Sequence, residues 1–481
     1  MRIKYYNEYF YITLSSFLLT VLLGDLLYIH TDNILWLTSF FICGYFFIIL
    51  RQMLIGNFYT LYCFYLLTST FFMYDKFILG PLLGKGVLSI NFLGTYSFPD
   101  WVAEKFVFIA AISITVIEIV YNCKIKKEIV LEKNNTELIY KKDNTVFTNT
   151  FYYKIGMVIM YIFIIPLVYK IILQIQNQKA FSDYAIANFT QHNRKVSFPW
   201  WTKGSGTFFY IGFLLFLYSF PSSKKVKFGY FLYFIMMLTT ALKGGRAFFF
   251  TYLLCIPLIM KKLYRKTLSR MQIVILFFVL CGGAIFLGNF RSNLSMQVKK
   301  GELLNFLYGQ TTTMGVPYVY INNNGDIPYR HYPFILTNII RPIQFHFRSI
   351  NLNPIDYMKV SNNYGLITLY MLNPYAVETG GGLGLNFLTE AYDFFGFIGV
   401  VLWSFILALI IKYLDKKRYN NKNRTTFIVD FFIYQYVLFL PRHSFFGIVS
   451  ELKYIILFFV VYFFLEERNY YKPNLYREKR K

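Results

Sequence analysis

An arginine introduces an apolar stretch in the segment LKGGRAFFFTYLL, residues 242–254. Gly244 and Gly245 precede Arg246, and because they have no side chains their backbone N–H groups can approach a ligand closely. A guanidinium at a helix N-terminus is unfavourable, because the helix dipole is positive there. An anion between them would remove the conflict, and arginine binds phosphate oxygens bidentately. We therefore expect these three residues to bind a phosphate group, either of a substrate or of a lipid head group.

Two further arginines lie where apolar stretches end. Arg291 closes one such stretch, and Arg442 lies between the last two. Each arginine, taken alone, can be explained by a side chain that extends to the phosphate of a lipid head group. Arg246, Arg291 and Arg442 are expected at one membrane depth, which favours a shared anion site.

A second basic group lies in NIIRPIQFHFRSINLNP, residues 338–354. Arg341 and Arg348 are seven residues apart, which places them on one face if the segment is a helix, although the alternating Phe345 and Phe347 would also suit a strand. His346 lies between them and His331 lies in PYRHYPF, although a single histidine is more often structural than catalytic. The sequence contains no Asp-x-Asp pair and no His-Glu-x-x-His motif. If the chemistry involves a phosphate leaving group, we expect arginines, and neither a metal nor another cofactor, to neutralise it.

The composition places these residues in a membrane protein. Of 481 residues, 56% are hydrophobic and 15% are charged, whereas a soluble protein carries about 25% charged residues. Apolar runs of about 15 to 22 residues recur from end to end, which is typical of an all-α polytopic membrane protein. We predict one integral membrane domain, residues 1–481, with twelve transmembrane helices. Their ranges are 10–29, 32–50, 54–73, 101–121, 155–175, 205–221, 228–242, 247–260, 271–289, 394–412, 425–440 and 445–465.

The basic residues indicate which loops face the cytoplasm. The segments 222–227, 261–270 and 412–424 fall on one side of the predicted helices. The N-terminus, the segment 122–154 and the basic tail (466–481) fall on the same side, so the positive-inside rule places both termini in the cytoplasm. The net charge of +25 is then explained by topology, and we expect no nucleic-acid partner.

One loop dominates the other side. Residues 290–393, between the ninth and tenth predicted helices, are rich in Tyr, Asn, Pro and Gly. Loops longer than about 15 residues are usually functional or disordered, and this loop has little low-complexity sequence. We expect it to be folded on the outer surface of the membrane.

The stretch ETGGGLGLNFLTEAYDFFGFIGVVLWSFILALI (378–410) resembles the C-terminal signature of bacterial O-antigen polymerases, the Wzy-type oligosaccharide repeat-unit polymerases. The family pattern is Gly-x-Gly-polar, then Glu-x-Tyr-x-Asn/Asp-aromatic-Gly-x-x-Gly before a helix. The matching residues are Gly382, Gly384, Asn386, Glu390, Tyr392, Asp393, Gly396 and Gly399. KGGRA (243–247) and FLPRHSFF (439–446) are similar to two arginine turns of the family.

The resemblance implies a metal-independent membrane glycosyltransferase whose active site faces the periplasm, in the bacterial plasma (inner) membrane. Its donor and acceptor would be glycans linked to polyprenyl diphosphate. Joining their repeat units would make O-antigen or capsular polysaccharide and release polyprenyl diphosphate. The resemblance also implies two partners besides the substrates, the lipid bilayer and a chain-length regulator protein.

This chemistry requires charge stabilisation for the diphosphate and a base for the acceptor hydroxyl. The residues expected to hold the diphosphate are Arg246, Gly244, Gly245, Arg291 and Arg442, and Arg341 and Arg348 are second-choice candidates for the same role. The candidates for the base are His346, His331, Glu378 and Glu390. Glu390 also has a structural interpretation, because a carboxylate at the start of a helix stabilises the helix dipole.

Two other functions remain as alternatives. A lipid-linked oligosaccharide flippase would be expected to have two similar halves, short loops and charges facing a central cavity. This chain has one dominant outer loop and charges concentrated at the outer edge. An O-antigen ligase of related architecture is the nearer alternative.

Overall fold

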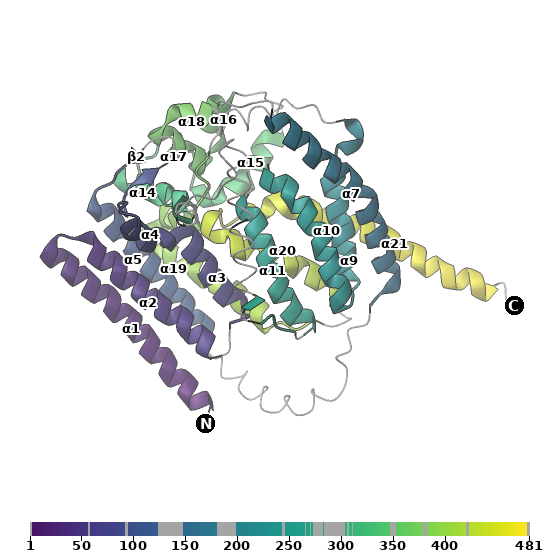
Figure 1. Ribbon diagram of the computed structural model, residues 1–481, viewed down its shortest axis with the longest axis horizontal. Helices are drawn as coiled ribbons and strands as arrows, with labels where there is room; N and C mark the ends of the chain where they lie inside the picture. The colour runs from purple at the N-terminus through teal and green to yellow at the C-terminus, as the bar shows by residue number, and fades with distance from the viewer. Residues whose placement is uncertain are drawn as a thin grey trace.

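The structure is a computed structural model of the chain (Figure 1). It describes residues 2–55, 58–91, 95–123, 148–179, 199–242, 246–264, 266–269, 271–272, 282, 304, 307–309, 311–346, 353–378, 382–419 and 423–478. The described residues are mostly helical, with one antiparallel strand pair, β1 (Ile90–Asn91) and β2 (Thr95–Tyr96). This confirms the prediction of an all-α protein in its main feature.

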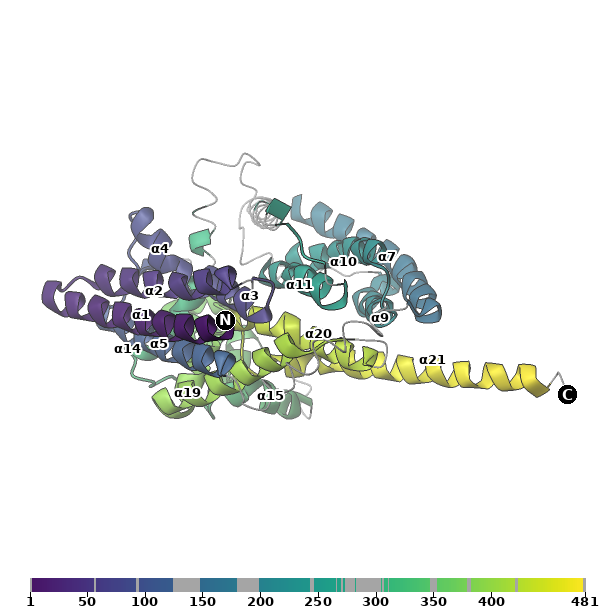
Figure 2. The same cartoon turned by 90° about the horizontal axis from the view of Figure 1, so that it is seen from below.

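Helices in the first part of the chain follow the predicted apolar runs. They are α1 (Arg2–Thr31), α2 (Ile34–Leu54), α3 (Leu61–Ser69), the π-helix η1 (Thr70–Tyr74), α4 (Asp75–Leu82), α5 (Asp100–Asn122), α7 (Thr150–Lys179), η2 (Trp200–Thr202), α9 (Ser205–Tyr218), α10 (Ser223–Leu242) and α11 (Arg246–Tyr264). The helices in the last part of the chain are α19 (Phe387–Lys416), α20 (Arg424–Phe439), η5 (Leu440–Arg442), η6 (Gly447–Glu451) and α21 (Leu452–Glu478). Figure 2 shows α21 extending well beyond the other helices.

Five helical segments are long and apolar enough to cross a membrane. They are Phe10–Thr31, Ile34–Leu54, Thr150–Leu173, Phe387–Lys416 and Gly447–Glu466. Each predicted range except 271–289 overlaps a helix, and that range lies almost wholly outside the described residues. A membrane-embedded protein is therefore confirmed, whereas the number twelve stays a prediction.

One helix begins later than the sequence predicts. The range 54–73 was expected to be helical, but α3 starts at Leu61 and its turns continue through η1 and α4 to Leu82. The carboxylate of Asp415 explains the start, because it accepts hydrogen bonds from the N–H groups of Leu61 (2.7 Å) and Tyr62 (3.1 Å). These are among the N–H groups that a helix N-terminus leaves without an intrahelical partner.

Segments predicted to be cytoplasmic meet at one end of the helices, which we call the basic end. There Lys262 Nζ donates to the carbonyl oxygen of Leu414 (2.9 Å), and Lys412 Nζ donates to that of Val120 (2.8 Å). The N–H of Asn149 donates to the carbonyl oxygen of Ser219 (2.8 Å). Lysines at helix C-termini are favourable because they bind carbonyl groups at the negative end of the dipole.

At the opposite end of the helices, part of the long predicted loop is folded. Its elements are η3 (Thr311–Met314), α14 (Gly315–Asn322), η4 (Phe334–Leu336), α15 (Thr337–His346), α16 (Pro354–Ser361), α17 (Tyr364–Leu372) and α18 (Pro374–Glu378). They surround a small core of their own, in which the rings of Phe334 and Tyr364 stack with centroids 4.2 Å apart. Figure 1 shows most of this group as the green cluster beside α19.

Helix α19 breaks near its start. Phe395 and Gly396 have non-helical backbone angles, and Gly396 has a φ of 58° that disfavours any residue with a Cβ. Past the break, a Cβ at Gly399 would collide with the carbonyl oxygen of Ala391. The two glycines of the Gly-x-x-Gly pattern, Gly396 and Gly399, therefore allow a sharp bend in α19. The bend separates the first two turns of the helix from its long apolar part.

Candidate functional site

Four segments that are distant in sequence meet around Arg442. The hydroxyl of Thr313 on η3 donates to the carbonyl oxygen of Phe72 on η1 (2.9 Å). The guanidinium carbon of Arg442 lies 5.8 Å from the centroid of the Phe72 ring, and Gly384 packs against both Thr313 and Arg442. We call these four residues the Arg442 junction. A π-helix such as η1 is rare, and it occurs frequently at functional sites.

Gly384 allows the close approach of these segments. Its φ is 87°, in the left-handed region that favours glycine. A Cβ at this position would lie 3.0 Å from Cγ2 of Thr313 and 3.7 Å from Cγ of Arg442. On the other side of Gly384, its carbonyl oxygen lies close to Gly365. A Cβ on residue 365 would collide with that oxygen. Any side chain at position 384 would therefore push the junction apart.

The polar residues that follow Gly384 fix the start of α19 and the turn of Arg442. Oδ1 of Asn386 caps the helix, since it accepts a hydrogen bond from the N–H of Leu388 (2.9 Å). Glu390 is buried in the first turn, where its Oε2 accepts a hydrogen bond from the N–H of Phe445 (3.0 Å). The direct cap of the helix is thus Asn386, and the Glu390 carboxylate reaches across to the segment that follows Arg442.

His443, next to Arg442, is a residue that sequence reasoning passed over. Its Nδ1 lies 3.3 Å from the hydroxyl of Tyr436, and that hydroxyl donates to the carbonyl oxygen of Ser444. Burial, together with a smaller effect of the positive charge of Arg341, lowers the pKa of His443 to about 4. The imidazole is therefore neutral at pH 7. The adjacent arginine in FLPRHSFF was the only sequence signal for it.

Asp393 attaches the folded part of the long predicted loop to α19. Its Oδ1 lies 3.0 Å from a guanidinium nitrogen of Arg330 and accepts a hydrogen bond from the hydroxyl of Tyr320 (3.1 Å). Its Oδ2 accepts one from the N–H of Phe334 (2.8 Å). Three contacts from one carboxylate give this residue of the signature a clear positioning role.

Two of the candidate bases lie in other surroundings. Nε2 of His331 lies 2.8 Å from the carbonyl oxygen of Lys359, and the backbone N–H of His331 donates to Oδ1 of Asn362 (2.9 Å). Both contacts join His331 to other residues of the folded part of the long predicted loop. Glu378 is exposed at the end of α18. His346 ends α15, and its side chain lies outside the described residues.

The predicted phosphate-binding residues are only partly described. Gly244, Gly245, Arg291 and Arg348 lie outside the described residues, as does the side chain of Arg246, whose backbone begins α11 as predicted. Arg341 and Arg442 are described. Helix α15, which carries Arg341, packs against η6, the turn that begins five residues after Arg442.

The direction of α11 places Arg246 at the same end as Arg442. Helix α11 packs along α20, and Lys262 near its C-terminus donates to the carbonyl oxygen of Lys417 (3.3 Å). Lys417 in turn forms an ion pair with Asp430 near the start of α20 (2.5 Å). The two helices are therefore antiparallel, and the start of α11 lies beside the end of α20, where η5 and Arg442 follow.

The described part of the chain contains no group of three or more His, Cys, Asp or Glu residues placed to hold a metal ion. No curated protein and no solved structure matches the chain. The sequence model of one family, O-antigen polysaccharide polymerase Wzy, matches residues 9–474. That range is nearly the whole chain and includes the signature whose residues build the Arg442 junction and its surroundings. The chain therefore belongs to the O-antigen polysaccharide polymerase Wzy family.

Proposed function

We propose that the protein polymerises oligosaccharide repeat units carried on polyprenyl diphosphate, at the periplasmic face of the bacterial plasma membrane. Family membership implies O-antigen repeat-unit polymerisation. The observation that carries the finer proposal is that Arg442 packs on Gly384 beside the capped start of α19, while α15, which carries Arg341, packs against the turn that follows Arg442. The product is O-antigen or capsular polysaccharide, and a chain-length regulator protein is a proposed partner.

The proposed reaction is one glycosyl transfer. A hydroxyl of the acceptor repeat unit attacks the anomeric carbon of the donor glycan. The bond between that carbon and the diphosphate oxygen breaks, and polyprenyl diphosphate leaves with the electron pair. A base takes the proton of the hydroxyl. We assign the stabilisation of the leaving diphosphate to Arg442 and Arg341, because arginine forks bind phosphate oxygens in two places and stay charged.

The position of the start of α11 supports the assignment of a third cation, Arg246, to the proposed diphosphate site. Arg246 begins a helix whose N–H groups are free to bind an anion, and this helix start lies at the same end as Arg442. We propose that Gly244, Gly245 and Arg246 contribute to the same diphosphate site, and Arg291 and Arg348 remain proposed members of it. For the base, His346 and His331 remain the candidates, with Glu378 and Glu390 as alternatives; we favour His346, because Glu390 accepts a backbone hydrogen bond and His331 contacts Lys359.

Deletion of the gene, followed by electrophoresis of the surface polysaccharide, tests the proposal. A polymerase mutant should lose the ladder of long chains and still carry one repeat unit. Complete absence of attached units would identify a flippase or a ligase instead. Complementation with the Arg442→Lys variant then tests the assigned role. Loss of the ladder supports a two-point contact with phosphate, whereas an unchanged ladder contradicts it.

A further inference from the structure

A buried lysine lies one helical turn from the Arg442 junction. Lys76 is the second residue of α4, which continues η1 without a gap, and its side chain is 2% exposed. Phe72, a member of the junction, is four residues earlier on the same continuous helix. Residues four apart lie on one face of a helix. Lys76 is therefore about 6 Å along the helix axis from the residue on which the guanidinium of Arg442 packs.

Lys76 and Phe72 contact the same partner segment. Nζ of Lys76 lies 5.3 Å from the centroid of the Tyr318 ring. Tyr318 is on α14, five residues after Thr313 on η3, and η3 runs directly into α14. Thr313 donates to the carbonyl oxygen of Phe72 within the junction. Two successive contacts therefore join the same pair of segments, and the second of them involves a lysine.

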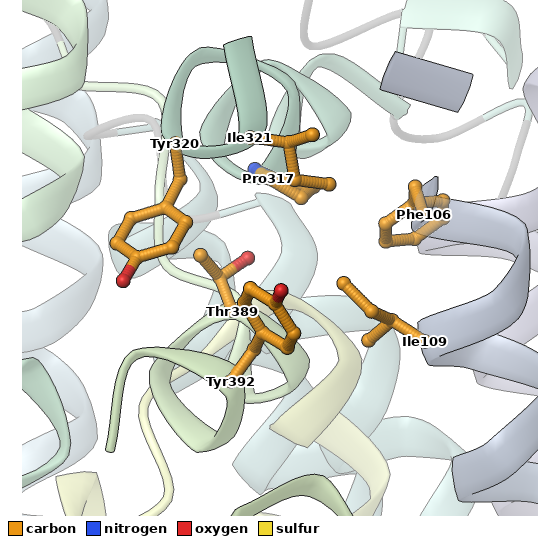
Figure 3. Close-up of a pocket in the computed structure, with 7 residues that line it drawn as sticks. All are labelled: Phe106, Ile109, Pro317, Tyr320, Ile321, Thr389 and Tyr392. Atoms are coloured by element: carbon orange, nitrogen blue, oxygen red, sulfur yellow. The ribbon is translucent and has the colours of Figure 1, made fainter. Parts of the chain in front are cut away.

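Helix α14 also packs against the start of α19. Figure 3 shows Pro317 of α14 beside Thr389 and Tyr392 of α19, with Phe106 of α5 across the same narrow space. The contacts of α14 with both α5 and α19 fix this short helix between them. Lys76 therefore contacts a helix that is itself attached to the helix start beside Arg442.

Lys76 has no counter-charge. Within the described residues it forms neither an ion pair nor a hydrogen bond, and its ammonium group faces the Tyr318 ring. A buried ammonium without a partner is costly, which favours loss of its proton. Burial accordingly lowers the pKa of Lys76 to about 7. This lysine is therefore about half protonated at neutral pH, and a negative charge nearby would favour its charged form.

One neighbour of Lys76 changes charge in the same pH range. Burial raises the pKa of Asp75, the preceding residue, to about 7. Tyrosines remain protonated at pH 7, and on α5 the facing residue is the apolar Phe106, whose ring contacts Phe77. Asp75 and Lys76 must therefore be separated in any test. The titratable side chains on the elements around Lys76 are Tyr74 and Asp75 on its own helix, Tyr45 on α2, Lys85 after α4, Tyr318 on α14, and Tyr308.

We propose that Lys76 takes up a proton as negative charge develops on the diphosphate at the Arg442 junction. In the proposed transfer the bond between the anomeric carbon and the diphosphate oxygen breaks, and the leaving polyprenyl diphosphate gains a negative charge. The proton of the acceptor hydroxyl passes to the base and then to solvent. Lys76 binds one proton from solvent, so protons and charge both balance. This inference rests on the proposed function, because that reaction creates the charge.

Lys76 acts here as a positioning residue, through its electric field rather than by contact with the substrate. An additional arginine would stay charged throughout, and it would bind the product as strongly as it stabilises the departing group. A lysine that is neutral before the transfer adds its charge only when the diphosphate needs it. Loss of the proton afterwards weakens the hold on the product. A titrating group therefore assists both departure and release.

The test measures binding of geranylgeranyl diphosphate to the purified full-length protein in lipid nanodiscs, from about pH 6 to about pH 9. Calorimetry in two buffers of different ionisation enthalpy gives the number of protons taken up on binding. Lys76→Met removes the titrating amine and keeps a long side chain, and Asp75→Asn removes the neighbouring carboxyl group. Lys203→Met, at an exposed lysine just before α9, is the matched control.

We expect the unchanged protein to take up about half a proton more than Lys76→Met near pH 7.5. The reason is that an anion about 10 Å away, at an effective dielectric constant of about 20, raises the pKa of a lysine by about one unit. The affinity of the unchanged protein, relative to that of Lys76→Met, should fall about tenfold from pH 6 to pH 9. Ionisation of the ligand itself cancels in this ratio.

The two other variants should behave as the unchanged protein does. Asp75→Asn and Lys203→Met should keep both the proton uptake and its pH dependence. The melting temperature of Lys76→Met should be equal or higher, because the variant removes a buried ammonium that has no partner in the described residues.

Three results would overturn the inference. They are equal proton uptake by Lys76→Met and the unchanged protein, a pH dependence that disappears in Asp75→Asn instead, and a lower melting temperature of Lys76→Met. The two proposals can fail separately. Binding whose proton uptake ignores Lys76, in a protein that polymerises, contradicts only this inference. No binding of the diphosphate to the unchanged protein contradicts the proposed diphosphate site as well.

Discussion

The carboxylate of Glu390 accepts a hydrogen bond from the N–H of Phe445, three residues after Arg442, at 3.0 Å. This bond joins the start of α19 to the turn before the last helix. Glu390 is 1% exposed, so water does not compete for it. One signature residue thereby fixes the position of an arginine that lies more than fifty residues away in the sequence.

We predict that Glu390→Gln keeps the polymer ladder and that Glu390→Ala loses it. Glutamine retains an oxygen that can accept the bond from Phe445, whereas alanine leaves that buried N–H unpaired, at a cost of about 1–3 kcal/mol. Electrophoresis of the polysaccharide and thermal unfolding of both purified variants check this. A Gln variant that folds normally yet makes no polymer would instead identify Glu390 as the base.

For Arg442→Lys we expect long chains to be reduced at least about tenfold, because lysine keeps the charge and loses the two-point contact with phosphate. The matched control is Arg418→Lys, an exposed arginine at the basic end, which should leave the ladder unchanged. Quantified gels of complemented deletion strains give the comparison. Equal ladders from the two variants would remove Arg442 from the diphosphate site.

Gly384→Ala should abolish polymer formation, whereas Gly382→Ala should be tolerated. Alanine at a φ of 87° costs about 1–2 kcal/mol, and its Cβ would press on Thr313 at 3.0 Å. The nearest contact of a Cβ at Gly382 is Leu366 at 3.9 Å, which is ordinary van der Waals distance. The readouts are protein level in the membrane and the polysaccharide ladder. A functional Gly384→Ala protein would show that the junction does not need its close packing.

The pH dependence of stability should contain a contribution from His443. Its pKa in the folded protein is lowered from 6.5 to about 4, because burial disfavours the charged form. Below about pH 6.5 the unfolded chain takes up a proton that the folded chain does not, so stability falls until about pH 4. Thermal unfolding of His443→Phe over this range should show a smaller loss. Identical pH profiles for both proteins would contradict the shift.

Parts of the candidate site could be anticipated from the sequence. Glu390, Asp393 and the glycines of the signature were identified by pattern, and Arg442 by its place between two apolar runs. Their physical roles could not be read there, because each role depends on a distant segment. Glu390 was interpreted as a base or as a carboxylate that stabilises the helix dipole, and neither interpretation included its hydrogen bond from the N–H of Phe445. His443 carried no sequence signal beyond the arginine that precedes it.

The sequence by itself determined that this is a helical membrane protein, and it located most helices. Each apolar run must satisfy its own backbone hydrogen bonds and remove its own side chains from water, and both requirements are local. Only the tertiary structure decided that Phe72, Thr313, Gly384 and Arg442 meet, and that α19 breaks at Gly396. Contacts between helices arise from the fit of many side chains at once, and no single stretch of sequence contains that fit.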